Sequence, residues 1–297
     1  MLKHLNPIKQ KPARVVVLGS KGFVGSHILQ QLQQENCDIV GISKNDINLL
    51  TNEAEEKLLK TLKLNDVLVI VSSIVPCKSS EMLIDNIRMM QVICNTIQKV
   101  SLSHVIYISS DAVYSDDMTL ISENAKPSPS NLHGTMHFCR ENMLKCIINQ
   151  TPLAILRPSI LYGMSDPHNS YGPNRFLRQI ENNQDITLFG EGEEKRDHVY
   201  IGDVAKIASL VIHHKSEGVL NIATGESCSF KDIANDMLKA ANSSNVMITS
   251  RRNNAILHRY FDNSVCYKAF PHFQYVTFKN GLKKIIKRET NSKLTVY

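Results

Sequence analysis

Residues 15–29 read Val15-Val-Val-Leu-Gly19-Ser-Lys-Gly22-Phe-Val-Gly25-Ser-His-Ile-Leu29. The apolar run before the glycines is typical of a parallel strand that is covered on both faces. Apolar residues then recur at helical spacing as far as Leu32. Glycines let the backbone turn sharply and approach a diphosphate at the helix N-terminus. The spacing is Gly-x-x-Gly-x-x-Gly, not the usual Gly-x-Gly-x-x-Gly. The flanking strand and helix nevertheless predict a nucleotide-binding loop, and the alternative is an ordinary strand-to-helix turn.

The composition is that of an ordinary soluble protein. The chain has 297 residues, of which 42% are hydrophobic and 21% charged, enough for one large α/β domain or two lobes. The formal charge of +6 is spread along the chain, except for Lys283-Lys284 and Lys287-Arg288, which we interpret as the solvated end of a final helix. Basic and aromatic residues do not interleave as they would for stacked bases. We therefore expect no nucleic-acid partner.

The cysteines and the N-terminal residues indicate in which cellular compartment the protein works. Seven cysteines are scattered without a C-x-x-C pair, which predicts reduced thiols, no disulfide framework and no zinc knuckle. Residues 1–14 are polar and basic, unlike a signal peptide. No apolar run approaches the roughly 20 residues that a membrane span needs. We expect a cytoplasmic protein without a membrane partner.

Strand-like and helix-like segments alternate through the first half of the chain. Strands are expected at 15–18, 38–42, 67–71, 105–108, 153–156 and 219–223, and helices after the glycines and at 52–62, 81–100 and 130–149. This alternation predicts the α/β class, with a doubly wound parallel sheet and right-handed crossovers.

The second half predicts a smaller lobe. Residues 163–174 are loop-rich, 185–189 suggest a short strand, and helices are expected at 229–241 and 278–287. We assign residues 1–163 to a dinucleotide-binding domain that residues 197–225 complete. Residues 164–196 and 226–297 form the lobe, which would close over the carboxyl ends of the strands, where ligands bind. Asp203 is expected to cap a helix that begins at Val204.

Six motifs then occur in a recognisable order. They are Gly19-x-x-Gly22-Phe-Val-Gly25, Ser109-Ser110-Asp111-Ala-Val113-Tyr114, Arg157-Pro158, Tyr162-Gly163, Arg196-Asp197-His-Val-Tyr200-Ile-Gly-Asp203-Val204-Ala and Asn221-Ile-Ala-Thr-Gly225. From about residue 13 to 290 the chain resembles the extended short-chain dehydrogenase/reductases, the NAD(P)-dependent nucleotide-sugar epimerases, dehydratases and reductases. The resemblance implies a Rossmann domain, a C-terminal substrate lobe and a homodimer formed through a four-helix bundle. It also implies chemistry on a 4-keto nucleotide sugar, in the synthesis of surface-glycan or lipopolysaccharide precursors.

The resemblance also implies where the cofactor binds. The residues assigned to it are Gly19, Lys21, Gly22, Phe23, Val24, Gly25, Ser43, Lys44, Asp46, Ile47, Ser72, His137 and Pro158. The second strand ends without the acid that usually holds the ribose of NAD. Ser43, Lys44 and Lys21 instead suit a 2′-phosphate, and the pattern is similar to that of the NADP-dependent reductases of the family. We expect NADP. NAD remains possible if Lys44 only lies in a solvated loop, with Asp46 just beyond it.

The catalytic set departs from the family. The resemblance implies a serine, which Ser110 matches, and a Tyr-x-x-x-Lys pair that moves a proton at the sugar while a hydride moves at nicotinamide. That pair is absent. His133 stands at the tyrosine position and His137 at the lysine position, and no tyrosine lies between Tyr114 and Tyr162.

Three hypotheses remain for these histidines. In the first, catalysis persists through Ser110, His133 and His137, because a histidine of pKa near 6.5 needs less activation than a phenol near 10. In the second, the site binds NADP and a nucleotide sugar without turnover, as a regulatory or partner protein. In the third, His133, His137 and Glu141 bind a divalent metal from one helix face. Such spacing is common by chance, so we assign no metal.

The resemblance finally implies a set of substrate residues. Arg196 matches an arginine that binds the nucleotide diphosphate, which a guanidinium can hold in bidentate fashion. Asn174 lines up with a loop that approaches the sugar. Asp111 falls where dehydratases carry an acid, although a loop cap is the simpler interpretation. Arg259 is either a second diphosphate contact or part of a surface salt bridge.

Overall fold

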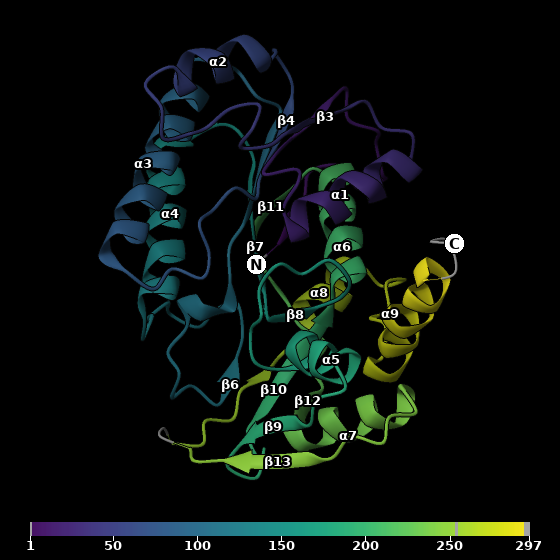
Figure 1. Ribbon diagram of the computed structural model, residues 1–297. Coiled ribbons are helices and arrows are strands. Elements are labelled where there is room, and N and C mark those ends of the chain that lie inside the picture. Colours follow the sequence, from purple (N-terminus) through teal and green to yellow (C-terminus); the bar gives the residue numbers. More distant parts are fainter. Residues whose placement is uncertain (1, 253–254, 294–297) are drawn as a thin grey trace.

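A seven-stranded sheet forms the centre of the computed structural model, which describes residues 2–252 and 255–293 (Figure 1). The strand order is β1-β11-β7-β5-β4-β2-β3. All neighbours run parallel except the short β1, which pairs antiparallel to β11. The bounds are β1 Lys3–His4, β2 Val15–Leu18, β3 Ile39–Ile42, β4 Val67–Ile70, β5 His104–Ile108, β7 Leu153–Pro158 and β11 Ser216–Ile222. The chain goes to β3 on one side of β2 and to β4 on the other. The loop after β2 therefore lies at the switch point, where such sheets bind ligands.

Helices cover both faces of this sheet, as the alternating pattern predicts. On one face, Val15 and Val17 pack with α1 and α6, and on the other Val16 and Leu18 pack with α2 and α3. The bounds are α1 Phe23–Gln34, α2 Ala54–Thr61, α3 Ser80–Ile97, α4 Leu132–Ile147, α6 Ile201–His213 and α8 Ser264–Ala269. Figure 1 shows α2, α3 and α4 together on one side of the sheet and α1 and α6 on the other. The doubly wound α/β architecture is confirmed.

A second group of elements lies below the large sheet in Figure 1 and has its own core. Its apolar centre includes Tyr162, Phe176 and Phe230, all buried. Its strands form the sheets β12-β10-β8 and β13-β9, and a separate pair joins β14 to β6. The bounds are β6 Leu120–Ile121, β8 Ile160–Tyr162, β9 Ile186–Phe189, β10 Lys195–Tyr200, β12 Ser227–Ser229, β13 Met247–Ser250, β14 Tyr260–Phe261, α5 Pro173–Glu181, α7 Phe230–Ala240 and α9 Phe278–Lys293.

Three local expectations need correction. Asp203 does not cap its helix, because α6 already begins at Ile201 with Tyr200 as the N-cap, and the Asp203 carboxylate instead accepts a hydrogen bond from the backbone N–H of Val276 (2.8 Å). The expected loop at 163–174 ends earlier, since Pro173 opens α5.

The final helix is longer than the sequence suggested. It extends to Lys293, beyond the predicted end at 287. Lys283 is exposed as expected, and the Lys284 Nζ lies 5.3 Å from the ring centroid of Tyr200. The side chains of Lys287 and Arg288 lie outside the described residues. Within the described ranges, no helix is both long and apolar enough to cross a bilayer.

Candidate functional site

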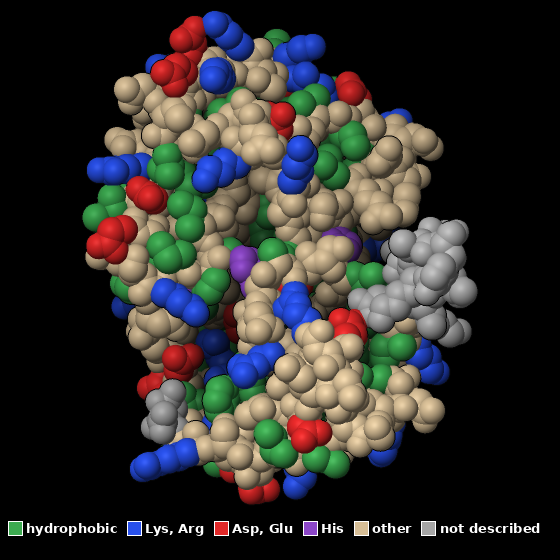
Figure 2. All heavy atoms as spheres, in the orientation of Figure 1, with side chains coloured by type: hydrophobic (Ala, Val, Ile, Leu, Met, Phe, Trp, Pro, Cys, Tyr) green, Lys and Arg blue, Asp and Glu red, His purple; other side chains and the backbone are tan. Residues whose placement is uncertain are grey.

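A cavity of about 800 Å³ opens at the carboxyl ends of the central strands, a size typical of ligand pockets. Figure 2 shows the corresponding face, which is hollowed between the large sheet domain and the smaller lobe. The cavity gathers most of the residues that the sequence assigned to a cofactor or to catalysis. Those that line it are Gly19, Lys21, Gly22, Phe23, Val24, Ser43, Lys44, Ile47, Ser72, Ser110, Asp111, His133, His137 and Pro158.

The glycine loop is packed too tightly for side chains. Gly19 has φ +98°, and a Cβ there would lie 2.7 Å from the backbone nitrogen of Ser72. A Cβ at Gly25 would lie 2.2 Å from the carbonyl oxygen of Gly19. Gly25 is therefore a packing residue of the loop and does not line the cavity itself.

The wall around this loop suits a diphosphate. Gly22 is the N-cap of α1 and offers no side chain to its first turn, so the amides there are free to meet an anion. The buried Ser72 hydroxyl, which lines the cavity, has no hydrogen-bond partner among the described residues. An unpartnered buried hydroxyl is costly, and a bound polar ligand would satisfy it.

Two lysines and one carboxylate lie near the tip of β3, namely Lys44 and Asp46 just after the strand and Lys21 in the glycine loop. The backbone N–H and the hydroxyl of Ser43 both donate to Asp46 Oδ2, at 2.8 and 2.6 Å. These bonds, with a smaller contribution from Lys21, lower the pKa of the Asp46 carboxyl. Lys21 and Lys44 are exposed and line the cavity, whereas Asp46 does not. The Ser43 hydroxyl therefore already donates its proton to Asp46, within its own turn, and not toward the cavity.

His137 is held from behind by a tyrosine. The Tyr107 hydroxyl lies 2.8 Å from His137 Nδ1. Burial, His133 and Arg140 lower the pKa of His137 well below 6.5, and burial raises that of Tyr107. Both groups are therefore neutral near pH 7. The Tyr107 hydroxyl has no other acceptor among the described residues, so it donates to Nδ1. The proton of His137 is then on Nε2, and the ring offers one fixed N–H donor.

His133 is also neutral near pH 7. Burial lowers its pKa, although the nearby Asp111 carboxylate opposes the shift. Its ring meets that of His137 edge-on, with centroids 4.8 Å apart. The backbone N–H of Cys77 donates to His133 Nδ1 over 3.5 Å, a long and weak bond. This bond favours the tautomer that carries the proton on Nε2.

Glu141 is committed to a buried ion pair. Its carboxylate accepts bonds from Arg157 Nε (2.9 Å) and Nη2 (2.6 Å) and from the Ser109 hydroxyl (2.7 Å). Burial alone would raise the pKa of Glu141, but these bonds lower it below its usual value. In the described part of the chain, His133, His137 and Glu141 do not bring ligand atoms together. The hypothesis of a metal on this helix face therefore has no geometric support.

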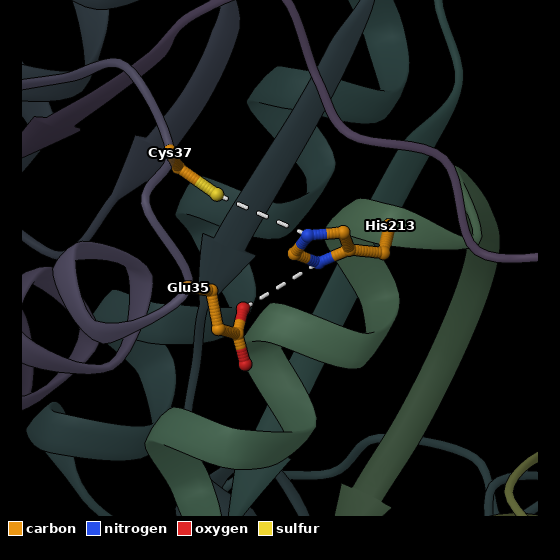
Figure 3. A group of neighbouring side chains, drawn as sticks. All are labelled: Glu35, Cys37 and His213. Carbon is orange, nitrogen blue, oxygen red and sulfur yellow. Dashed lines mark hydrogen bonds and ion pairs between the residues drawn. The ribbon is translucent and has the colours of Figure 1, made fainter.

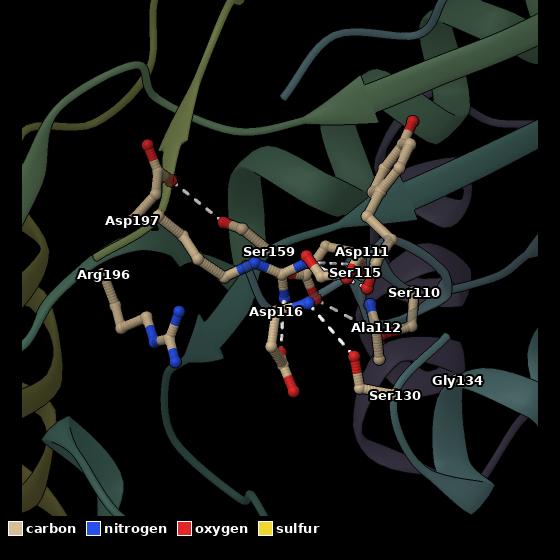
Figure 4. Close-up of polar contacts among 12 residues, drawn as sticks. Ser110, Asp111, Ala112, Ser115, Asp116, Ser130, Gly134, Ser159, Arg196 and Asp197 are labelled. Atoms are coloured by element: carbon tan, nitrogen blue, oxygen red, sulfur yellow. Dashed lines mark hydrogen bonds and ion pairs between the residues drawn. The ribbon is translucent and has the colours of Figure 1, made fainter. Parts of the chain in front are cut away.

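Ser110 and Asp111 line the cavity, and Figure 4 shows their polar contacts. The Ser110 hydroxyl accepts a bond from the N–H of Ala112 (3.1 Å) and caps the short 3-10 helix Asp111–Val113. Asp111 Oδ2 lies 3.3 Å from Arg259 Nη1. Arg259 also donates from Nη2 to the carbonyl oxygens of Asp111 (3.2 Å) and Tyr114 (3.3 Å). The structure thus has the salt bridge that was one of the two alternatives for Arg259, but the arginine is buried and not on the surface, since it is only 6% exposed. Its guanidinium is held by the chain and does not line the cavity.

Arg196 and Asn174 lie outside the lining of the cavity. In Figure 4 the Arg196 side chain points away from that of Asp197, as neighbouring strand positions do. Arg196 Nη2 pairs with Glu194, while its buried Nη1 has no partner among the described residues. Asn174 is in the first turn of α5 and not in the expected loop. There it accepts from the N–H of Gly163 (3.1 Å) and donates to Asp166 (2.8 Å).

Sequence reasoning missed two residues that support the site. Tyr107 lies on β5, and Arg140 is fully buried on α4. The Arg140 guanidinium carbon lies 5.3 Å from the Tyr107 ring centroid, and Nη2 donates to the carbonyl of Ser72 (2.8 Å). Arg140 therefore places a fixed positive charge behind His137. The sequence feature that could have identified Arg140 was its position one turn after His137 on the same helix.

Comparisons with known proteins agree with this geometry. A model of the NAD dependent epimerase/dehydratase family matches residues 15–223 of the chain. A putative UDP-glucose 4-epimerase of Methanocaldococcus jannaschii is 27% identical over 243 residues, which cover 74% of this chain and 79% of the relative.

Solved structures share the fold over nearly the whole chain. The UDP-glucuronic acid 4-epimerase from Bacillus cereus, in complex with UDP-glucuronic acid and NAD, matches with a TM-score of 0.80 at 21% identity, over 94% of this chain and 99% of that one. A GDP-L-fucose synthetase from Naegleria fowleri bound to NADP matches with a TM-score of 0.84 at 17% identity, over 99% of both chains.

Proposed function

Because the chain belongs to the NAD dependent epimerase/dehydratase family, we propose that it binds NADP and a nucleotide sugar in the 800 Å³ cavity. We propose further that it acts there as an epimerase or reductase at a 4-keto sugar, with His133 in the place of the family's tyrosine. One observation carries the proposal. The glycine loop, Ser110 and both histidines line a single cavity. The working protein would be a cytoplasmic homodimer, formed through a four-helix bundle, that serves surface-glycan or lipopolysaccharide precursor synthesis.

The preference for NADP rests on charge. Lys21 and Lys44 line the cavity and are exposed, so they can meet a 2′-phosphate with charge-assisted bonds. Asp46, the one acid of this turn, is held by Ser43 and stays off the lining. A ribose 2′-hydroxyl would therefore lack the acidic partner that NAD-specific sites supply. The related structures include several with NAD and one with NADP, so the preference proposed here rests on the lysines of this chain.

The proton chemistry falls to His133 and Ser110. A bound nicotinamide dinucleotide supplies the acceptor or donor of hydride. The chain must then hold or move the proton at the sugar oxygen. A neutral His133 with its proton on Nε2 can donate a hydrogen bond to a 4-keto oxygen, as neutral imidazoles do in sites that polarise carbonyls. To accept a proton at Nε2, the ring must first exchange its tautomer and release the weak bond from Cys77.

The tautomer of His133 and the neutrality of His137 favour a second function, that of a protein of this fold that binds its ligands without turnover. In the resting tautomer His133 is a donor and not a base. His137 carries no charge near pH 7 where the family has a lysine. Its role toward the cofactor would be limited to the Nε2–H bond that Tyr107 orients.

The two functions are separated by turnover. We expect the purified protein with NADP(H) to convert at least one member of a panel of 4-keto and 4-hydroxy nucleotide sugars, with the conversion monitored by NMR. His133→Phe should lower kcat by about 100-fold or more, the usual contribution of a general acid or base, and His133→Tyr should retain measurable activity. Lys57→Ala, on the exposed face of α2, is the control. An active His133→Phe variant would exclude the proposed role of His133. Cofactor binding with no turnover across the panel would establish the binding protein.

A further inference from the structure

A second group of reactive side chains lies at the ends of α1 and α6 (Figure 3). Glu35 is the C-cap of α1, Cys37 follows in the turn into β3, and His213 is the last residue of α6. One ligand atom from each of the three lies within 4.8 Å of the other two. None of the three lines the cavity, so the proposed function makes no use of them.

The histidine is oriented as a metal ligand would be. His213 Nδ1 lies 2.8 Å from the carbonyl oxygen of Ser209, to which it donates. Nε2 then carries the lone pair, and it faces Cys37 Sγ at 3.9 Å. Histidines that bind metals commonly donate their other N–H to a backbone carbonyl in this way, which fixes the tautomer and the ring orientation.

The carboxylate is oriented by its own partners. Glu35 Oε2 accepts a bond from the Ser209 hydroxyl (2.5 Å), and Oε1 accepts one from Gln31 (2.7 Å). Oε2 lies 3.8 Å from His213 Nδ1, so the Glu35 carboxylate borders the same ring as the Cys37 thiol. In Figure 3 the thiol approaches Nε2 and the carboxylate approaches Nδ1, so the Glu35 side chain has to turn toward Nε2 to share an ion with Cys37. Residues that orient the ligands are thus already in place around Glu35 and His213.

We propose that Glu35, Cys37 and His213 bind one Zn²⁺, with solvent as the fourth ligand. Thiolate, imidazole and carboxylate are the three protein ligands of zinc, and its preferred geometry is tetrahedral. Bonds of about 2.3 Å to sulfur and about 2.0 Å to nitrogen place those two atoms about 3.5 Å apart. The observed separation of 3.9 Å between Cys37 Sγ and His213 Nε2 is close to this. Glu35 has a ligand atom within 4.8 Å of the other two, and its carboxylate completes the set by rotating toward Nε2.

Charge and protons balance in such a site. Burial, and then the Glu35 carboxylate, raise the pKa of the Cys37 thiol, so the metal-free thiol is protonated near pH 7. On binding, the S–H bond breaks, the S–Zn bond forms and the proton leaves to solvent. Cys37 thiolate and Glu35 carboxylate then neutralise the two positive charges of the ion, without any change of oxidation state.

The ion would tie three segments together. It would link the end of α1 to the end of α6, and these helices pack against the same face of the sheet. The N-terminal segment joins them, because the backbone N–H of Gln10 (2.9 Å) and the side-chain amide of Asn6 (3.3 Å) donate to the carbonyl of His213. Since α1 begins at the glycine loop, the ion would stabilise the helix on which the nucleotide site depends.

The test is metal binding by the full chain after treatment with a chelator. We expect one equivalent of Zn²⁺ by isothermal titration and elemental analysis, and a rise in Tm on its addition. Co²⁺ should give a thiolate-to-cobalt charge-transfer band, a spectroscopic signature of a sulfur ligand. Cys37→Ser should abolish that band. Glu35→Gln should weaken Zn²⁺ binding by more than about 100-fold, the upper end of what loss of an outer-shell partner costs. Cys146→Ser, which removes an exposed thiol elsewhere, should bind like the wild type.

The alternative outcomes are distinct. The proposal is overturned if the wild type binds less than one equivalent, or if Cys37→Ser keeps both the stoichiometry and the cobalt band. His213→Gln provides the same comparison from α6. Because Glu35, Cys37 and His213 lie outside the cavity, titration of NADPH into the zinc-free protein tests the proposed function separately.

Discussion

His137 belongs to the interior as much as to the cavity. It is 5% exposed, with Tyr107 bonded to Nδ1 and the fixed charge of Arg140 behind that tyrosine. The ring of His133 is held more weakly, by the 3.5 Å hydrogen bond from the Cys77 N–H. The two histidines therefore differ in freedom. His137 is held in one tautomer, whereas His133 can exchange its tautomer at little cost.

Another buried histidine gives a prediction on stability. Burial lowers the pKa of His104 to about 4, and its Nε2–H donates to the carbonyl of Ser216 (2.7 Å). The unfolded ring titrates near 6.5, so below that pH the unfolded state binds more protons than the folded one. The contribution of neutral His104 to stability is complete above about pH 6.5. It is lost as the pH falls toward 4, by up to about 3 kcal/mol.

Urea unfolding between pH 7 and 4.5 measures this loss. His104→Gln keeps an N–H donor for Ser216 but removes the titration, so its free energy of unfolding should fall less steeply over this range. Parallel pH profiles for the wild type and the variant would show that other groups cause the acid sensitivity.

The element that organises the site is the turn from β2 into α1. Gly25→Ala would place a Cβ 2.2 Å from the carbonyl oxygen of Gly19, and backbone must shift to accommodate it. Gly22→Ala is the matched control, because its Cβ would lie 3.3 Å from the same oxygen. We expect Gly25→Ala to lower the free energy of unfolding by about 1–3 kcal/mol, the usual cost of overpacking, and to weaken dinucleotide binding.

Thermal and urea unfolding of the two ligand-free variants measure this difference. Gly22→Ala should stay within about 1 kcal/mol of the wild type. Equal stabilities for Gly25→Ala and the wild type would contradict the packing argument.

The strands and helices of the sheet domain could be predicted from the sequence because their apolar runs face two covered surfaces. Val15–Leu18 and Val67–Ile70 are fully apolar and fully buried. The strand Lys195–Tyr200 was missed, because its residues are polar and pair with partners that only the fold supplies. Asp197, for example, accepts bonds from Ser159 (2.9 Å) and from the N–H of Gly225 (2.8 Å).

In the site, too, some residues could be predicted from the sequence and others could not. The residues of the glycine loop and the two histidines were predictable, because motif spacing places them at the ends of neighbouring strands and helices. The commitment of Arg259 to Asp111 was not, since these residues are 148 positions apart in the chain. Nor was the bond between Tyr107 and His137, which depends on how α4 packs against β5.

At the scale of the whole molecule, one cavity at the switch point of the sheet joins the glycine loop to the segment Asp166–Tyr171. We propose that a phosphorylated nicotinamide dinucleotide occupies this cavity. A ligand at about 100 times its Kd stabilises the folded state by about 2.7 kcal/mol, which a rise in Tm reports. Lys44→Ala should weaken the binding of NADPH more than that of NADH, because the lysine is placed to meet the 2′-phosphate. Lys57→Ala should change the affinity for neither nucleotide.

The most direct measurement is the titration of NADPH and of NADH into the wild-type protein, Lys44→Ala and Lys57→Ala by isothermal calorimetry. We expect one site per chain, tighter for NADPH than for NADH, with the difference reduced in Lys44→Ala alone. Binding of neither nucleotide to the wild type, with no rise in Tm from either, would contradict the proposal.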